Sequence, residues 1–444
     1  MIPWETIKIG ELIDKGEASL QTGPFGTQLK ASEYVATGIP LINVKNIGYG
    51  SIRIDDLDFL DERTADRLRV HRLKPGDIVF GRKGAADRHA LIGPGSAGWI
   101  QGSDCMRLRL KSKRLSPRFL SYYFCTSGHK YWMEAVCAFG ATMSTLNQGI
   151  VRRITLRVPE IGVQNKIAGI LSAYDELIEN NERRIALLEK LAKEIYREWF
   201  VRMRFPGHEQ AKFEKGVPVS WEFDVASKFF GHVKGKSYTG DELTDNPDHM
   251  PFITLKSFNR GGGYRADGLK HYSGKYKEDQ VVLRGDVVMA VTDMTQNREV
   301  VGRAARIPEI GAKGAVISLD VIKLTPKIVS ASFLYSYLRL SGFGEFIKEF
   351  ANGTNVLHLN PVLVMRQRII MPPKELREQF VALVGPIYDQ IDSLNIVLDG
   401  ITSSRDMLLP RLVSGKLNVE NLDIQFPPCM REGRTAITSP TAYA

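Results

Sequence analysis

Residues 164–200, QNKIAGILSAYDELIENNERRIALLEKLAKEIYREWF, decide the fold that this sequence predicts. Apolar side chains recur there at alternating spacings of three and four residues, with two positions skipped, which is the seam pattern of a coiled-coil helix. The same pattern returns 213 residues later (380 − 167), so we expect two long helices. The predicted seam residues are Ile167, Leu171, Tyr174, Ile178, Ile185, Leu188 and Ile195 in the first helix, and Phe380, Val384, Ile387, Ile391, Leu398, Ile401 and Leu408 in the second.

The duplication extends into the sequence that precedes each helix. GIPLINVKNI, which ends at Ile47, resembles HMPFITLKSF, which ends at Phe258. LKPGDIVF around Asp77 resembles VLRGDVVM around Asp286. A repeat on this scale indicates two similar modules, each followed by a long helix. The predicted boundaries are 1–159 for the first module, 160–204 for the first helix and its linker, 205–372 for the second module, 373–418 for the second helix, and 419–444 for a mobile tail.

Within each module the expected elements are short. Apolar stretches such as GDIVFG read as strands bounded by Gly, whereas residues 116–136 and 330–350 read as one helix each. In the second long helix, Gly385-Pro386 is expected to bend the first turns. We therefore predict an α+β protein, in which two similar modules of mixed α and β structure and two long helices form a pseudo-two-fold duplication. The strand order within a module cannot be derived from the pattern.

The composition is that of a globular chain with a basic surplus. Its 444 residues include 60 Lys and Arg against 50 Asp and Glu, and the net charge of +10 suits a polyanionic partner. The four cysteines, Cys105, Cys125, Cys137 and Cys429, lie far apart, so we expect neither a disulfide framework nor a cysteine zinc site. A reducing cytoplasm is the expected location. No apolar run is long enough to predict a membrane span.

Motifs that would carry catalysis are weak. GPGSAG, residues 93–98, has the glycine spacing of a dinucleotide-binding loop, but Pro94 lies inside it and no helix is expected after it, so a turn is predicted. GHVKGKS, residues 231–237, has one residue too few between its glycines for a phosphate-binding loop. We expect no catalytic residue and no metal site. Two alternatives stay open: a coiled-coil assembly protein whose modules bind protein, and a fused methyltransferase or nuclease with an unrecognised active site.

Polar loops at matched places in the two modules give the strongest functional signal. Each loop is an apolar stretch that runs into Lys, Arg, Asn, Gln or Thr beside Gly, and such side chains can reach base edges and phosphates. For any single residue, a solvated loop is the competing interpretation. The loops are 41–53, 80–93 and 139–148 in the first module and 252–265, 289–302 and 351–360 in the second. The predicted DNA-binding residues are Lys45, Asn46, Arg82, Lys83 and Arg88 in the first module, and Lys256, Asn259, Arg260, Thr292, Gln296, Asn297 and Arg298 in the second.

Several stretches resemble a known family. TGPFGTQLKASEY (22–34), LLEKLAKEIYREWF (187–200) and MLLPRLVSGKL (407–417), together with the duplication, resemble the specificity subunit of type I restriction-modification systems. The resemblance covers roughly residues 1–418.

This resemblance implies two target recognition domains, each reading one half of a split site in double-stranded DNA, with the two helices as an antiparallel coiled-coil spacer. Because the two modules differ in loop sequence, the site should be asymmetric. The implied partners are two modification (methyltransferase) subunits and the restriction (translocase and endonuclease) subunits. S-adenosylmethionine, ATP and magnesium would belong to those partners, with no cofactor in this chain and no membrane contact.

Overall fold

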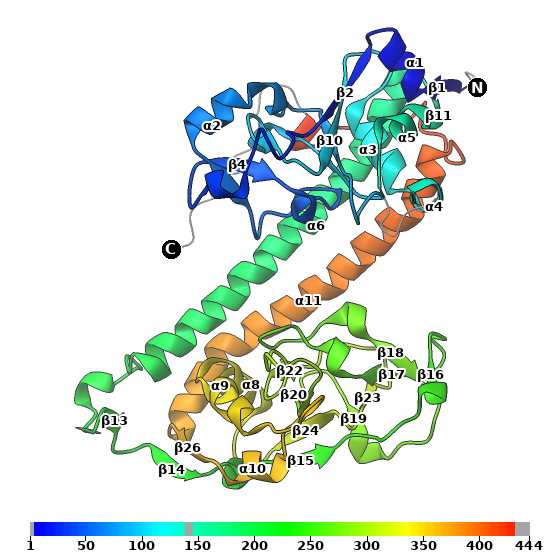
Figure 1. The fold of residues 1–444 in the computed structure, drawn as a ribbon. Coiled ribbons are helices and arrows are strands. Elements are labelled where there is room, and N and C mark those ends of the chain that lie inside the picture. The colour runs from blue at the N-terminus through cyan, green and yellow to red at the C-terminus, as the bar shows by residue number, and fades with distance from the viewer. Residues whose placement is uncertain (1–3, 138–144, 431–444) are drawn as a thin grey trace. The chain divides into compact units, whose positions relative to one another are not determined.

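The computed structural model describes residues 4–137 and 145–430, and the chain forms two compact units. Unit 1 consists of residues 1–180 and 400–444, and unit 2 of residues 181–399. Two long helices, α6 (Ile161–Tyr196) and α11 (Lys374–Val413), run through this division, so that each unit holds one module and part of each helix. Figure 1 shows the two helices and the elements that precede them. Among the described residues, no helix is long and apolar enough to cross a membrane.

The module of unit 1 contains two sheets. One has the strand order β2-β10-β7-β8-β5 and the other the order β3-β6-β4-β9. The pairs β4–β9 and β5–β8 are parallel, and the other pairs in these sheets are antiparallel. A separate pair, β1–β11, joins the start of the module to its end. The strands are β1 Glu5–Lys8, β2 Ala18–Thr22, β3 Tyr34–Val35, β4 Ile39–Ile42, β5 Tyr49–Gly50, β6 Asp58–Leu60, β7 Ile78–Gly81, β8 His89–Leu91, β9 Ile100–Gln101, β10 Cys105–Leu110 and β11 Thr155–Val158, and the helices are α1 Ile9–Asp14, α2 Glu62–Arg67, α3 Pro117–Cys125, α4 Ser127–Cys137 and α5 Gln148–Arg153.

The module of unit 2 repeats this plan. Its main sheets have the orders β15-β24-β20-β22 and β16-β18-β17-β23-β19, and β14–β26 corresponds to β1–β11. The parallel pair β17–β23 corresponds to β4–β9. The duplication seen in the sequence is therefore also a duplication of strand order. The strands are β12 Phe213–Glu214, β13 Val217–Pro218, β14 Glu222–Val225, β15 Phe230–Lys234, β16 Leu243–Thr244, β17 Met250–Ile253, β18 Lys270–Tyr272, β19 Val281–Val282, β20 Val287–Ala290, β21 Thr292–Asp293, β22 Ala304–Arg306, β23 Ala315–Ile317, β24 Val321–Pro326, β25 Leu357–His358 and β26 Arg368–Met371, and the helices are α7 Ala226–Phe229, α8 Ala331–Leu340, α9 Phe343–Ile347 and α10 Pro361–Arg366.

The long helices run in opposite directions within each unit. In unit 1 the start of α6, with Ile167 and Leu171, shares a core with Leu412 near the end of α11. In unit 2 the end of α6, with Tyr196, shares a core with Phe380 near the start of α11. Two mixed modules on a pair of long antiparallel helices confirm the predicted α+β class.

The predicted seam lies on the inner faces of these helices. Ile167, Leu171, Phe380 and Val384 are buried, and the other predicted seam residues are partly buried. Asn181, which occupies a skipped seam position, is only 6% exposed. The helix α11 continues through Gly385-Pro386 without interruption, although a proline cannot donate the backbone hydrogen bond of that turn.

Two local predictions are wrong. The segments 116–136 and 330–350 each form two helices instead of one, because Thr126 adopts an extended conformation and Gly342 a left-handed one (φ +84°). The mobile tail predicted from residue 419 is also wrong for residues 419–430. Lys166 Nζ donates to the carbonyl oxygen of Glu420 at 2.7 Å, and the Cys429 backbone nitrogen donates to Glu176 Oε1 at 2.8 Å. The rest of that predicted tail, 431–444, lies outside the described residues.

Candidate nucleic-acid interface

In unit 2 the three predicted loops are joined into one surface. The loop around residues 292–303 pairs with the loop around residues 351–358 through the short ladder β21–β25. The same loop contacts the one after β17, where the Gly261 backbone nitrogen donates to the carbonyl oxygen of Glu299 at 3.0 Å. Segments that are distant in the sequence thus present their polar side chains together.

Asp293 holds the middle loop in shape. Its side chain is buried, and its carboxylate accepts the backbone N–H groups of Thr295 (2.8 Å), Val300 (2.7 Å) and Val301 (3.1 Å). The Thr295 hydroxyl donates to the same carboxylate at 2.8 Å. Because one carboxylate accepts several backbone donors, it holds the two ends of the loop together. Residues 294–297 stay exposed at the tip of this loop.

The predicted residues of unit 2 are placed as follows. Asn297 and Lys256 are exposed, and Asn259 Nδ2 donates to the carbonyl oxygen of Tyr264 at 3.0 Å. Gln296 Nε2 donates to the carbonyl oxygen of Thr354 at 2.8 Å. Of the two predicted arginines in this unit, Arg260 pairs with Glu299 at 3.1 Å and Arg298 pairs with Glu349. Thr292 is a correction: it is 3% exposed within β21, so it supports the loop and is not available to DNA.

Unit 1 joins the corresponding loops. The His89 backbone nitrogen donates to the carbonyl oxygen of Gly48 at 3.1 Å, which links the first two loops. Lys83 and Thr145 form an isolated antiparallel β-bridge, and the Leu146 backbone nitrogen donates to the carbonyl oxygen of Arg82 at 2.8 Å. These contacts link the second loop to the third. Residues 138–144, which include most of the third predicted loop, lie outside the described residues.

Four of the five predicted residues of unit 1 reach the surface. Lys83 pairs with Asp104 at 3.0 Å, while Arg82 and Arg88 are partly exposed. Lys45 is held by Asp56, and this hydrogen bond raises the pKa of Lys45. Asn46 is a correction: it is 1% exposed, and its amide accepts from the Asn43 backbone nitrogen and donates to two backbone carbonyl groups, so it caps a turn and is not free to read a base.

The sequence reasoning missed an aromatic side chain in this surface. Tyr49 is 42% exposed, and its ring has Lys130 Nζ 3.8 Å and Arg88 Cζ 5.8 Å from its centroid. Its hydroxyl donates to Asp87, which raises the pKa of Tyr49. The signal that could have found Tyr49 is its place in the duplication, because it occupies the position of Arg260 in unit 2, two residues after the aligned pair Ile47 and Phe258.

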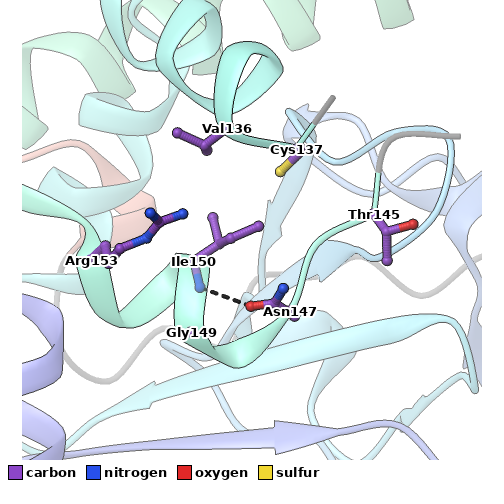
Figure 2. Close-up of a pocket in the computed structure, with 7 residues that line it drawn as sticks. All are labelled: Val136, Cys137, Thr145, Asn147, Gly149, Ile150 and Arg153. Carbon is purple, nitrogen blue, oxygen red and sulfur yellow. Dashed lines mark hydrogen bonds between the residues drawn. The ribbon is translucent and has the colours of Figure 1, made fainter. Parts of the chain in front are cut away.

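A hollow of about 450 Å³ lies in unit 1 between the end of α4 and the start of α5 (Figure 2). Among its seven described lining residues, Arg153 is the one charged group, and Asn147 Oδ1 already accepts the Ile150 backbone nitrogen as a helix cap at 3.0 Å. Cys137 and Thr145 border the segment outside the described residues. The described lining residues of the hollow therefore form no catalytic arrangement. Across residues 4–137 and 145–430, no group of His, Cys, Asp and Glu could hold a metal ion.

The chain contains two similar modules, each of which exposes a surface of joined polar loops and is followed by a long helix. This organisation defines a protein with two similar binding surfaces. Residues 1–190 match the family model described as type I restriction modification DNA specificity domain. Over this range the chain is similar to the DNA specificity domain of type I restriction-modification systems. Two of its relatives are named as specificity subunits of type I restriction enzymes.

Individual relatives agree in sequence and in fold. The specificity subunit of the type I restriction enzyme MjaIX from Methanocaldococcus jannaschii is 26% identical over 68% of this chain and 70% of its own length. The MjaVIII specificity subunit from the same organism is 23% identical over 95% of this chain and 94% of its own length. The crystal structure of the specificity subunit from M. genitalium shares the fold with a TM-score of 0.60, at 16% identity, over 93% of this chain and 99% of that one.

Proposed function

We propose that each joined loop surface reads one half of an asymmetric, bipartite site in double-stranded DNA. The observation that carries this proposal is that three loops, separated in sequence, meet in the same way in both units and yet differ in their side chains. Because the two modules share one scaffold, each can bind its half-site in the same orientation. Because their loops carry different side chains, the two modules can contact different bases.

The helices support a split site. The 36 residues of α6 and the 40 residues of α11 correspond to about 54 and 60 Å at 1.5 Å per residue. Two readers on helices of this length can address half-sites more than one DNA turn apart, which is roughly 34–36 Å.

We further propose that this chain directs two modification subunits and the restriction subunits to the site, in the cytoplasm. S-adenosylmethionine, ATP and magnesium then act in the partners. Neither glycine-rich stretch of this chain is built for a nucleotide: residues 94–96 form a single 3₁₀ turn, and residues 231–234 belong to strand β15. On this proposal the isolated chain transfers no methyl groups and cuts no DNA. Labelled methyl transfer by the purified polypeptide would contradict it.

The test is to sequence the methylated motif in cells that carry single variants. Arg82→Ala should relax or weaken only one half of the motif, and Gln296→Ala only the other, because each residue lies in a different unit. A lost base contact costs about 1–3 kcal/mol, whereas a lost phosphate contact weakens all sequences alike. Lys113→Ala is the matched control. Lys113 is exposed and follows the C-terminal end of β10, outside the three polar loops of unit 1.

A change in both half-sites caused by one substitution would show that a single module does not read a single half-site. Unchanged motifs and unchanged affinity for both variants would show that these loops are only solvated. A motif that persists in cells without this chain would rule out the chain as the source of specificity.

A further inference from the structure

Resting on the proposed function, we propose that the two modules divide the work of binding. In unit 2, Glu299 and Glu349 are positioning residues that hold Arg260 and Arg298 for reading base edges. In unit 1, cations without a carboxylate partner supply most of the attraction to phosphate.

The arginines of unit 2 are fixed before any DNA arrives. Arg260 Nε lies 3.1 Å from Glu299 Oε2, while 80% of the Arg260 side chain remains exposed. Glu299 is itself anchored, because its backbone oxygen accepts the Gly261 N–H at 3.0 Å. Arg298 has a left-handed backbone (φ +52°), which is costly for a residue with a side chain, and its guanidinium pairs with Glu349.

A carboxylate beside an arginine changes what that arginine can bind. A guanidinium has five N–H donors, so one pairing leaves an edge free for the two acceptors of guanine. The carboxylate also repels phosphate, so the pair is a weak partner for the DNA backbone. Fixing the long side chain in advance lowers the entropy that binding must overcome. These properties favour base reading over non-specific attraction.

The duplication allows a direct comparison between the units. Arg88 and Arg303 occupy the same position in the two modules. Arg88 directly precedes His89, which pairs with β7, and Arg303 directly precedes Ala304, which pairs with β20. Arg303 Nη1 lies 2.6 Å from Glu345 Oε1 on α9, and this contact lowers the pKa of Glu345 to about 2. The position aligned with Glu345 in unit 1 is Tyr131, three residues after Gly128 as Glu345 is three residues after Gly342. Arg88 therefore lacks the acid that neutralises Arg303.

Lys130 of unit 1 shares this property. Neither Lys130 nor Arg88 forms an ion pair with any residue in the described parts of the chain. Arg88 and Lys130 instead face the ring of Tyr49. Uncompensated cations on a surface release counterions when they meet phosphate, which makes binding depend steeply on salt.

The experiment measures DNA binding by the full chain assembled with its modification subunits, on one duplex with the methylated motif and one with that motif scrambled, over a range of salt. Glu299→Gln and Glu349→Gln should each bind the scrambled duplex more tightly, steepen its salt slope by about one unit, and discriminate less between the duplexes. Glu309→Gln is the matched control, because Glu309 is exposed and lies outside the three loops. Arg88→Gln and Lys130→Gln should reduce the salt slope by about one unit each and keep the discrimination.

Arg260→Lys separates positioning from simple folding. It keeps the charge and the contact with Glu299 but loses the two-pronged donor edge, so discrimination should fall while the salt slope stays the same. If Glu299→Gln and Glu349→Gln behave like Glu309→Gln, the proposed division of work is wrong. If the wild-type complex does not prefer its own motif, the proposed function itself fails, and the two failures are therefore distinguishable.

Discussion

A single buried carboxylate controls the second reading surface. Asp293 is 2% exposed and accepts backbone hydrogen bonds from both ends of its loop. In Asp293→Asn one acceptor oxygen becomes an NH₂ donor, which then faces the N–H groups of Val300 and Val301. An unsatisfied buried group costs about 1–3 kcal/mol, so the loop should open. We expect hydrogen exchange to speed up across residues 293–301 and recognition of the second half-site to weaken.

The control for this prediction is Asp245→Asn, at an exposed aspartate that pairs with Lys270. This substitution removes the same charge from the same unit without touching the reading loops. Equal exchange in residues 293–301 for wild type and Asp293→Asn would show that the loop does not depend on this carboxylate.

At the level of residues, sequence could indicate which segments carry the site but not which side chains are free. Lys45 and Asn46 look equivalent in the sequence, yet the amide of Asn46 has the right length to bond to its own turn and is buried. Thr292 is a second example, because it follows an apolar stretch as an exposed loop residue would and yet is buried. Glu299 and Glu349 could not be found, because their roles depend on partners brought near by folding.

The helix seam gives a prediction at the scale of elements. Ile391 is partly buried against the core of unit 2 that contains Phe380 and Val384. Ile391→Asp places a charge in that apolar seam, where an unpaired charge costs several kcal/mol, so the melting temperature should fall and assembly with partner subunits should weaken. Ile178→Asp should act in the same way in unit 1. Ile396→Asp is the control, because Ile396 is 51% exposed on the same helix. Equal melting of Ile391→Asp and Ile396→Asp would mean that Ile391 faces solvent.

Elements were predictable to the extent that their signals are local. The long helices follow from a heptad pattern that is readable over any few turns. The break between α3 and α4 depends on one extended residue, Thr126, whose conformation no periodicity reveals. Strand order was out of reach, because β10 pairs with β2 and β7 across more than twenty intervening residues and many alternative pairings share the same apolar pattern.

At the scale of the whole molecule, the two units should respond differently to acid. His129 is buried among the rings of Tyr123, Phe124 and Trp132, and this burial lowers the pKa of His129 to about 4. His89 is also fully buried, with its pKa lowered to about 3. The aligned positions in unit 2 are Phe343 and Ala304, which do not titrate.

The sign of the pH effect follows from these lowered pKa values. Between the folded pKa of about 4 and the ordinary value of 6.5, the unfolded chain binds a proton at His129 that the folded chain does not. Stability is therefore full above pH 6.5 and falls as the pH drops toward 4, by about 2 kcal/mol from His129 between pH 7 and pH 5. His129→Phe, which copies unit 2, should lessen the loss of melting temperature over that range. An unchanged loss would show that His129 does not govern it.

Unit 1 consists of two segments of the chain, one before unit 2 in the sequence and one after it. Its core combines Ile7 and Ile9 from the first segment with Leu412 and Val419 from the second. A ribosome makes the second module in one continuous stretch but must add about 220 residues after Asn180 before the first module can be completed, which takes roughly ten to forty seconds at ordinary rates of synthesis. During this interval the half-finished first module exposes the apolar surface that α11 later covers. The part of the protein that is translated first is thus the last to mature, and chaperones have their longest opportunity to engage it there.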